Sequence, residues 1–328
     1  MKVILFRTDG GVVAEVGTGH IYRSLLVADQ LRDASRVIFS SVDKPDYEHG
    51  HAMIKEAGYP LHLIAPDRYN NDLARLVQDC KPDFIICDIY QYDENDLRIL
   101  KQYGAPLMTY DHFDDHRKFS DYPINAFVEE TGNPYSGPGF AVIPPTPIRN
   151  FRTTPERIFI CFGGFDYLDI TMKLVAILSQ AEIATPVDVA IGSGYSNTAV
   201  LSQYADSSYG RIRIHRQSAH FLEVMAGADI AFVAGGLVFF QTLSLGMASI
   251  VICQYEHQME QVGSLGRHNA FFLLGMGNVL DPKAVTTVLS TLMTDLKLRY
   301  DFYERGRRLV DGDGLKRVVN IIRGHLEK

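Results

Sequence analysis

A histidine follows directly on a glycine-rich turn near the start of the chain. The stretch Gly17-Thr18-Gly19-His20 comes after an apolar run at 3–7 and opens a stretch with helical periodicity. An imidazole can exchange a proton near neutral pH, so a histidine presented by such a turn suits general-base catalysis. The alternative is a ring that only caps or packs against the turn. We predict that His20 is catalytic and that Gly17 and Gly19 belong to a substrate site.

Other polar side chains stand where they could share that site. Asp9 follows the first apolar run and could orient His20, bind ligand hydroxyl groups or simply pair with a nearby arginine. Arg23 lies on a neighbouring helix face and could reach a substrate or form a surface pair. Asp88 and Tyr90 end the run FIICDIY; the phenol can both stack and hydrogen-bond. We predict substrate contacts for Asp9, Arg23 and Tyr90.

Glycine turns recur in the second half of the chain, each after an apolar run. Glycine lets backbone N–H groups approach a phosphate, and the N-terminus of a following helix favours its negative charge. The alternative is that these glycines only make tight turns. No turn matches the dinucleotide fingerprint or the P-loop, which disfavours dehydrogenases and NTPases. We predict a nucleotide or phosphate site that includes Gly163, Gly164, Gly194, Gly235 and Gly236.

One cluster has the residue types of a metal site. Asp111 to His116 reads DHFDDH, with His112 and His116 four residues apart. The preceding apolar run favours a loop rather than a helix here, and a solvated turn explains the cluster. We predict no metal and no cofactor.

The elements that must position these residues alternate along the chain. Short apolar runs separated by helical patterns are typical of parallel sheets covered by helices on both faces. We predict an α/β fold with two doubly wound, Rossmann-like sheets, and a mainly helical segment after Asp281. The predicted strands are 3–7, 37–41, 61–65, 84–90, 106–111, 157–164, 187–194, 212–216, 229–236 and 248–253.

A proline-rich segment separates the two halves of this pattern. Six prolines between 133 and 157 make regular structure improbable there. We predict an N-terminal domain at 1–150 and a C-terminal nucleotide-binding domain at 151–328, facing a cleft at the carboxyl ends of their strands.

Composition limits the class of protein. The 328 residues suit two domains, and a formal charge of −7 does not favour a nucleic-acid partner. Four dispersed cysteines indicate reduced thiols and a cytoplasmic location. The first apolar run is too short for a signal peptide, and no stretch reaches the length of a membrane span. The oligomeric state stays open.

The ordered motifs of the chain resemble those of a known family. FRTDGGVVAEVGTGHIYR (6–23) looks like the pattern F-R-x-D followed by G-x-G-H-x-x-R of the UDP-sugar hydrolase of pseudaminic acid biosynthesis and the related spore-coat polysaccharide proteins. These are relatives of the murein N-acetylglucosaminyltransferase and share its two-domain GT-B fold. The resemblance continues through CDIY (87–90), PIRNF (147–151), CFGGFD (161–166), AIGSGYSN (190–197), AGADIAFVAGG (226–236), LSLGMASIVICQYEHQ (243–258) and DGDGLKR (311–317).

This resemblance implies a nucleotide-sugar hydrolase that inverts the anomeric carbon. His20 would deprotonate the attacking water, and the UDP leaving group would be held by the second domain. Glu256 and Gln258 match a segment that contacts the nucleotide-sugar. Gln241 stands where the family has a glutamate that clamps the ribose, and could still hydrogen-bond it.

Two departures and two alternatives accompany that reading. Leu237 and Val238 replace hydroxyl side chains that could meet a phosphate. A GT-B glycosyltransferase would use the same His20 on an acceptor hydroxyl instead of water. A non-catalytic nucleotide-sugar-binding protein would keep the glycine turns but would not need the segment from Gly17 to Arg23.

Overall fold

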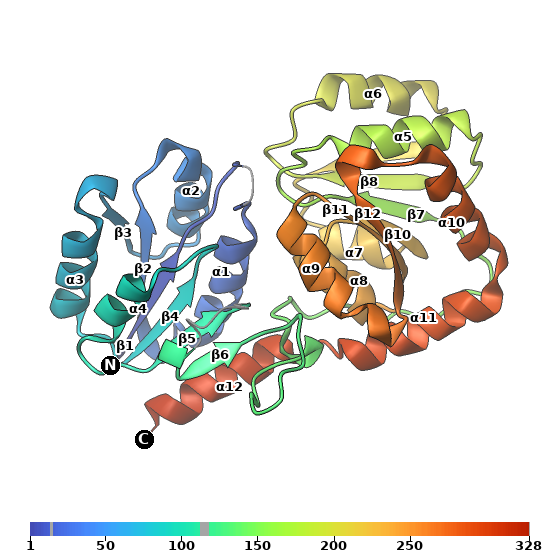
Figure 1. Cartoon of the computed structure of the whole chain (residues 1–328). Helices are drawn as coiled ribbons and strands as arrows, with labels where there is room; N and C mark the ends of the chain where they lie inside the picture. Colours follow the sequence, from blue (N-terminus) through green and yellow to red (C-terminus); the bar gives the residue numbers. More distant parts are fainter. Residues whose placement is uncertain (14–15, 112–117, 328) are drawn as a thin grey trace. The chain divides into compact units, whose positions relative to one another are not determined.

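The computed structural model describes residues 1–13, 16–111 and 118–327. It divides the chain into two compact units, Met1–Ile143 with Asp313–Lys328, and Pro144–Gly312. Each unit has a six-stranded parallel sheet with helices on both faces (Figure 1). The predicted α/β class with two sheets is therefore confirmed.

The sheet of the first unit has the order β3-β2-β1-β4-β5-β6. Its two faces are covered by different helices, because successive side chains of a strand point to opposite sides. Ile4, Phe6 and Phe84 pack with residues of α1 and α12 on one face, and Leu5 and Ile85 pack with α3 and α4 on the other. The elements are β1 (Lys2–Thr8), α1 (Gly19–Leu31), β2 (Ser35–Val42), α2 (Glu48–Glu56), β3 (Leu61–Ile64), α3 (Tyr69–Cys80), β4 (Phe84–Asp88), α4 (Glu94–Lys101), β5 (Leu107–Tyr110), β6 (Tyr122–Ile124) and α12 (Gly314–Leu326).

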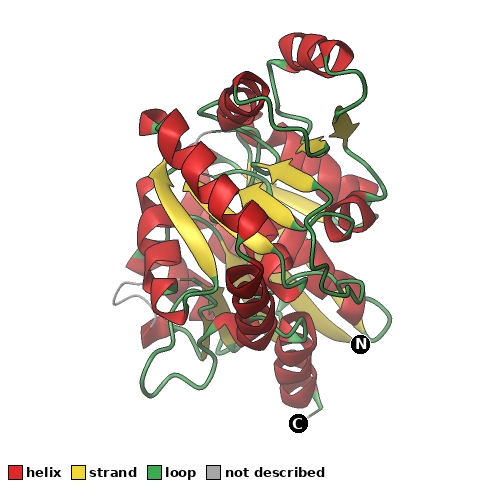
Figure 2. Cartoon of the chain, turned by 90° about the vertical axis from the view of Figure 1, so that its right-hand side faces the viewer, coloured by secondary structure: helices red, strands yellow, loops and turns green. Residues whose placement is uncertain are grey.

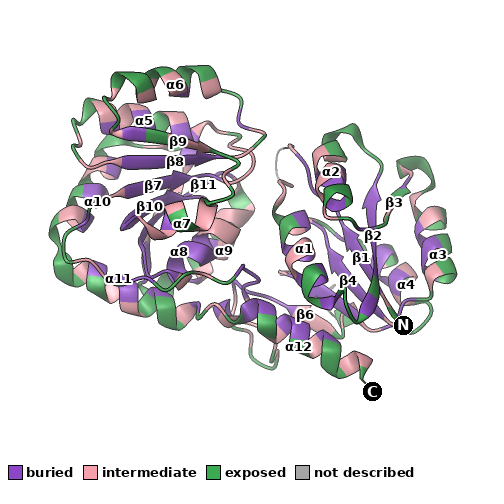
Figure 3. Ribbon diagram, turned by 180° about the vertical axis from the view of Figure 1, so that it is seen from behind, coloured by how far each residue is buried: buried purple, intermediate pink, exposed green. Residues whose placement is uncertain are grey.

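The last helix, α12, belongs to the first unit. The sequence-based division placed everything after residue 150 in the second domain, whereas the structure returns the chain to the first unit at Asp313. The reason is the apolar stripe of α12, since Leu315, Val318, Val319 and Ile322 are buried in the core around β1 and β4. Its exposed residues lie on the opposite face of the helix (Figure 3).

The sheet of the second unit has the order β12-β11-β10-β7-β8-β9. One face packs against α5, α6, α10 and α11 through an apolar core. Figure 2 distinguishes helices, strands and loops by colour. The elements are β7 (Ile158–Cys161), α5 (Ile170–Gln180), β8 (Val187–Ile191), α6 (Thr198–Ser207), β9 (Ile212–Arg216), α7 (Phe221–Ala226), β10 (Ile230–Val233), α8 (Leu237–Ser244), β11 (Ala248–Cys253), α9 (Glu256–Ser264), β12 (Phe271–Met276), α10 (Pro282–Thr294) and α11 (Leu296–Leu309).

Every predicted strand overlaps a strand of the structure, and the segment after Asp281 is helical as predicted. Two strands, β6 and β12, were not predicted. The four cysteines are free thiols, and those of β4, β7 and β11 are buried. Within the described ranges, no helix combines the length and the apolar character that crossing a bilayer requires.

Candidate active site

His20 makes a short contact with a buried carboxylate. It lies in the first turn of α1, and its Nδ1 is 2.7 Å from Oδ1 of Asp88, the last residue of β4. The His20 side chain is 22% exposed, whereas that of Asp88 is 1% exposed. A carboxylate that is ionised can only accept a hydrogen bond, so Nδ1 carries the proton and donates it. In the neutral imidazole, the other ring nitrogen, Nε2, then has a lone pair that can accept a proton.

Arg23 holds the same carboxylate from its other side. One helical turn after His20, its Nε and Nη2 donate to the two oxygens of Asp88 at 2.8 and 2.7 Å. Its Nη1 donates to Asp111, the residue that follows β5. The guanidinium also lies over the ring of Tyr110, 4.3 Å from its centroid. Arg23 is buried, and its charge is paired with carboxylates of the same chain. A substrate contact for Arg23 stays a prediction.

This arrangement controls the ionisation of Asp88. Burial by itself raises the pKa of the carboxyl, but the Arg23 guanidinium and the neighbouring His20 outweigh burial, so the pKa of Asp88 lies below its ordinary value. Burial lowers the pKa of Arg23, but Asp88 and Asp111 together outweigh this effect, so the pKa of Arg23 is raised. Asp88 is therefore negatively charged near neutral pH, and a negative charge beside His20 suits the partner of a general base.

Asp9 pairs with Arg7 rather than with His20. Its Oδ2 accepts from Arg7 Nη2 at 2.7 Å, and its Oδ1 accepts from the hydroxyl of Ser41 and the amide of Val42 at 2.9 Å each. Both side chains of the pair are buried. The contacts of Asp9 with Ser41 and Val42 join the end of β1 to β2, and its ion pair with Arg7 matches the structural alternative for this residue.

The glycine turn before α1 folds back on the end of β1. Gly11 donates its N–H to the carbonyl of Gly17 at 3.0 Å, and Gly17 has a φ of 47°, a conformation that favours glycine. Gly19 is the first residue of α1 and directly precedes His20. Tyr90 lies two residues beyond the end of β4 and is half-buried.

Two of the predicted turns in the second unit contact each other. The N–H of Gly194 donates to the carbonyl of Gly164 at 3.1 Å. A side chain at Gly192 has no room, since a Cβ there would lie 2.4 Å from Cα of Gly164. Gly163 has a φ of 83° and open space around it. The loops after β7 and β8 therefore pack backbone to backbone.

The helices behind these turns differ in what their N-termini bind. At α5, the carboxylate of Asp166 accepts from the amides of Ile170 and Thr171 at 2.9 and 2.7 Å, so a negative charge of the chain itself occupies this end. At α8, the N-cap is Gly236, and no side chain of the described residues caps the helix. The N-terminus of α8 would therefore accept a phosphate more readily than that of α5, and a phosphate site at Gly235 and Gly236 stays a prediction.

Gln241 lies in the second turn of α8 and is 2% exposed. Its Oε1 has no hydrogen-bond partner among the described residues. A buried oxygen without a donor is unfavourable, so a hydroxyl or a water at this position would stabilise it. Contact with a ribose stays a prediction for this residue.

The residues that open α9 are organised by a glutamine that the sequence did not single out. Gln254 follows β11 and is buried; its Nε2 donates to the carbonyl of Phe162, and its Oε1 accepts from the amide of Tyr167, both at 2.9 Å. The backbone N–H of Gln254 donates to Oε1 of Gln258 at 2.9 Å. Gln258 thus has a structural contact, and Glu256 is exposed in the first turn of α9.

Sequence reasoning noticed Asp88 but preferred Tyr90, and it interpreted Asp111 only as part of a possible metal cluster. The signal common to both aspartates is a carboxylate at the end of a buried apolar run. Since β1, β4 and β5 are neighbours in a parallel sheet, their carboxyl ends meet at one edge. Asp111 points to Arg23 in the structure, while the cluster members 112–116 lie outside the described residues. In the described ranges, no three His, Cys, Asp or Glu residues gather as metal ligands would.

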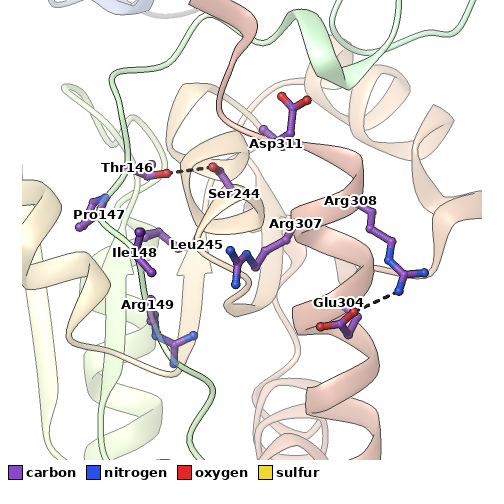
Figure 4. A pocket seen from close by; sticks show the side chains of 11 residues that line it. Thr146, Pro147, Ile148, Arg149, Ser244, Leu245, Glu304, Arg307, Arg308 and Asp311 are labelled. Carbon is purple, nitrogen blue, oxygen red and sulfur yellow. Dashed lines mark hydrogen bonds and ion pairs between the residues drawn. The ribbon is translucent and has the colours of Figure 1, made fainter.

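A surface pocket of the second unit contains none of the predicted site residues (Figure 4). It has a volume of about 440 Å³ and lies between the segment 146–149 and α11. Its charged side chains are largely engaged within the chain, since Arg149 pairs with Asp229, and Arg308 with Glu304. The carboxyl edges of the sheets, where the predicted site residues lie, are therefore the better candidates for a functional site.

Comparisons with known proteins agree with the fold. No family model matches the chain. It is 22% identical to the spore coat polysaccharide biosynthesis protein SpsG of Bacillus subtilis, over 100% of this chain and 99% of that protein. It is 23% identical to the UDP-2,4-diacetamido-2,4,6-trideoxy-beta-L-altropyranose hydrolase of Campylobacter jejuni, over 79% of this chain and 93% of that protein.

Among solved structures, MurG of Acinetobacter baumannii superposes with a TM-score of 0.73 at 14% identity, covering 99% of this chain and 100% of that one. The spinosyn rhamnosyltransferase SpnG complexed with thymidine diphosphate gives a TM-score of 0.66 at 15% identity, with both chains fully covered. The chain therefore has the GT-B glycosyltransferase fold, and the resemblance drawn from its motifs is confirmed.

Proposed function

We propose that this protein is a nucleotide-sugar hydrolase in which His20 is the general base. The observation that carries the proposal is the 2.7 Å contact between Nδ1 of His20 and Asp88, a carboxylate kept ionised by Arg23. It leaves Nε2 of His20 as the proton acceptor, and the imidazolium that forms is stabilised by Asp88.

In the proposed reaction, Nε2 takes a proton from a water molecule while the water oxygen attacks the anomeric carbon. The bond from that carbon to the diphosphate oxygen breaks, its electron pair leaves with the nucleoside diphosphate, and the configuration inverts. The N-terminus of α8 and the turn at Gly235 and Gly236 would stabilise the charge that develops on the diphosphate.

The likeness to the Campylobacter jejuni hydrolase supports water as the nucleophile. The likeness to SpsG supports a place in polysaccharide biosynthesis. The preference for UDP rests on the hydrolase relative, while the complex of SpnG holds a different diphosphate, thymidine diphosphate.

A glycosyltransferase is the second candidate, because SpnG, a solved structure with this fold, is a rhamnosyltransferase. The same His20–Asp88 pair would then deprotonate an acceptor hydroxyl. A nucleotide-sugar-binding protein without catalysis is the third candidate, but it would have no use for a histidine hydrogen-bonded to a buried carboxylate.

One experiment separates the three. The protein is incubated with UDP-, CMP- and GDP-sugars, and NMR follows the free sugar, its anomeric configuration and the nucleotide. Release without an acceptor supports the hydrolase. Turnover only after an acceptor is added would favour the transferase, and binding without any turnover would favour the third candidate.

A further inference from the structure

Four aromatic rings form a row at the carboxyl edge of the second unit's sheet. Phe165 and Tyr167 come from the loop after β7, Tyr255 directly precedes α9, and His257 lies in the first turn of α9. The ring centroids of Phe165 and Tyr167 are 6.4 Å apart, and those of Tyr167 and Tyr255 are 6.2 Å apart with their planes at 22°. Tyr255 and His257 are 5.5 Å apart and almost parallel, at 6°.

The side chain of Gln254 joins the two loops that carry this row. It binds the carbonyl of Phe162 and the amide of Tyr167, so the turn after β11 is fastened to the loop after β7. Because β10 lies between β11 and β7, the two loops flank the end of β10 and its glycine turn. Gly235 also packs against Gln258, since a Cβ added to Gly235 would lie 3.3 Å from Cβ of Gln258.

The row is not buried in the core of the unit. Tyr167 is 56% exposed, and Phe165, Tyr255 and His257 are half-buried. Aromatic rings on loops that are held in place by the hydrogen bonds of Gln254 are pre-organised to stack with a ligand ring, because ordering them on binding requires little further loss of freedom. Gln258 adds a polar group beside it, because only its Oε1 has a partner among the described residues.

We propose that Tyr167 and Tyr255 form an aromatic shelf that binds the sugar ring of a nucleotide-sugar by stacking against its C–H face. The inference rests on the proposed function and adds the means by which the sugar is recognised. A sugar is bonded directly to the diphosphate, whereas the base is separated from it by the ribose. The ring that meets a shelf next to the phosphate-binding turn is therefore the sugar, and Gln258 lies where its hydroxyl groups project.

The test measures the sugar and the nucleotide separately. Dissociation constants are determined for UDP-N-acetylglucosamine, UDP-glucose and GDP-mannose, and for UDP and GDP alone, in a His20→Asn background in which NMR verifies that the ligands stay intact. Tyr167→Ala and Tyr255→Ala should raise the Kd of the tightest nucleotide-sugar about 5- to 30-fold and leave that of its diphosphate within about twofold. Saturation transfer from aromatic protons should reach the sugar ring protons.

Matched variants show whether stacking is the cause. Tyr255→Phe keeps the ring and should bind like the parent protein, and so should Tyr209→Ala, which removes a fully exposed tyrosine of the same unit. Equal weakening of nucleotide-sugar and diphosphate, or saturation transfer to the base instead of the sugar, would overturn the shelf while leaving the proposed function in place. If the parent protein bound no nucleotide or nucleotide-sugar, both proposals would be wrong.

Discussion

At the scale of single residues, the carboxylate of Asp88 organises the candidate active site. It is bound by two side chains of one helix, His20 and Arg23, which are three residues apart and therefore on neighbouring positions of the same face. The glycine turn before α1 thus presents two groups with different tasks. His20 is partly exposed and free to act at Nε2, and Arg23 is buried and keeps Asp88 ionised.

Replacing His20 tests the base directly. We expect His20→Asn to lower the turnover number about 10²- to 10⁴-fold, because proton removal from the nucleophile is lost. Binding of the nucleoside diphosphate should stay within about twofold, since the second unit supplies the proposed phosphate site. Steady-state kinetics and titration calorimetry measure the two effects. The control is His62→Asn, which changes an exposed histidine of β3 and should leave turnover unchanged. Unchanged turnover in the His20 variant would exclude His20 as the base.

Replacing Asp88 tests the partner and its ionisation. Asp88→Asn should lower turnover by a similar factor and should destabilise the protein by about 3–5 kcal/mol at pH 7, because the buried Arg23 loses one of the two carboxylates that pair with it. The folded pKa of Asp88 is below its unfolded value, near 3.9. The contribution of ionised Asp88 to the free energy of unfolding is therefore complete above about pH 4 and is lost as the pH falls through the folded pKa.

The measurement for Asp88 is urea unfolding of variant and wild type at several pH values. The difference between their free energies of unfolding should narrow on the acidic side of pH 4. The exposed Asp67→Asn serves as the control and should change neither stability nor turnover. A difference that stayed constant down to pH 2 would show that charge is not what Asp88 contributes.

At the scale of elements, the closing helix α12 completes a core that begins at β1. Ile322 is fully buried there, so Ile322→Ala should destabilise the first unit by about 2–5 kcal/mol. The exposed neighbour Asn320→Ala should stay within about 0.5 kcal/mol of wild type. Chemical denaturation followed by circular dichroism measures both. Equal stability of the two variants would argue against α12 as part of this core.

The backbone contact between the loops after β7 and β8 gives a second prediction at this scale. Gly192→Ala should destabilise the second unit by at least about 2 kcal/mol and weaken diphosphate binding, since its Cβ would collide with Gly164. Gly263→Ala in α9 meets nothing within 4 Å and should be neutral or slightly stabilising. Thermal unfolding and calorimetry compare them. A Gly192 variant that bound and unfolded like the Gly263 variant would contradict the packing described.

The sequence predicted most elements because buried parallel strands are continuous apolar runs. β6 was missed because Tyr122–Ile124 is only three residues long and includes a proline. β12 was missed because an apolar run such as Phe271–Met276 cannot be assigned to a strand by periodicity alone.

The site was predicted only in part, because some of its contacts join residues that are far apart in the sequence. His20 could be selected from its local turn, but its contact with Asp88 joins residues 68 positions apart and depends on β1 and β4 being neighbours. Asp9 was chosen by proximity in sequence, and the structure shows that its partner is the nearer Arg7. The role of Gln254 likewise depends on the order of β11, β10 and β7.

At the scale of the whole molecule, the second unit is continuous in sequence and the first is not. We expect the fragment 144–312 to fold alone and to bind the nucleoside diphosphate. The fragment 1–143 should not fold, because it lacks the buried side chains of α12, whereas joining 313–328 to it through a short linker should restore folding. Heteronuclear NMR of the three fragments gives the answer. A folded 1–143 fragment would contradict the assignment of α12.

This discontinuity has a consequence for synthesis on the ribosome. The nascent first unit leaves the exit tunnel with its sheet but without α12, and roughly 170 residues must be translated before that helix follows. At about 5–20 residues per second, the delay is on the order of 10–30 s. Throughout it, the apolar surface around Phe6, Phe84 and Val142 stays uncovered while the second unit can already fold. The order in which the units mature is thus the reverse of the order in which they are made.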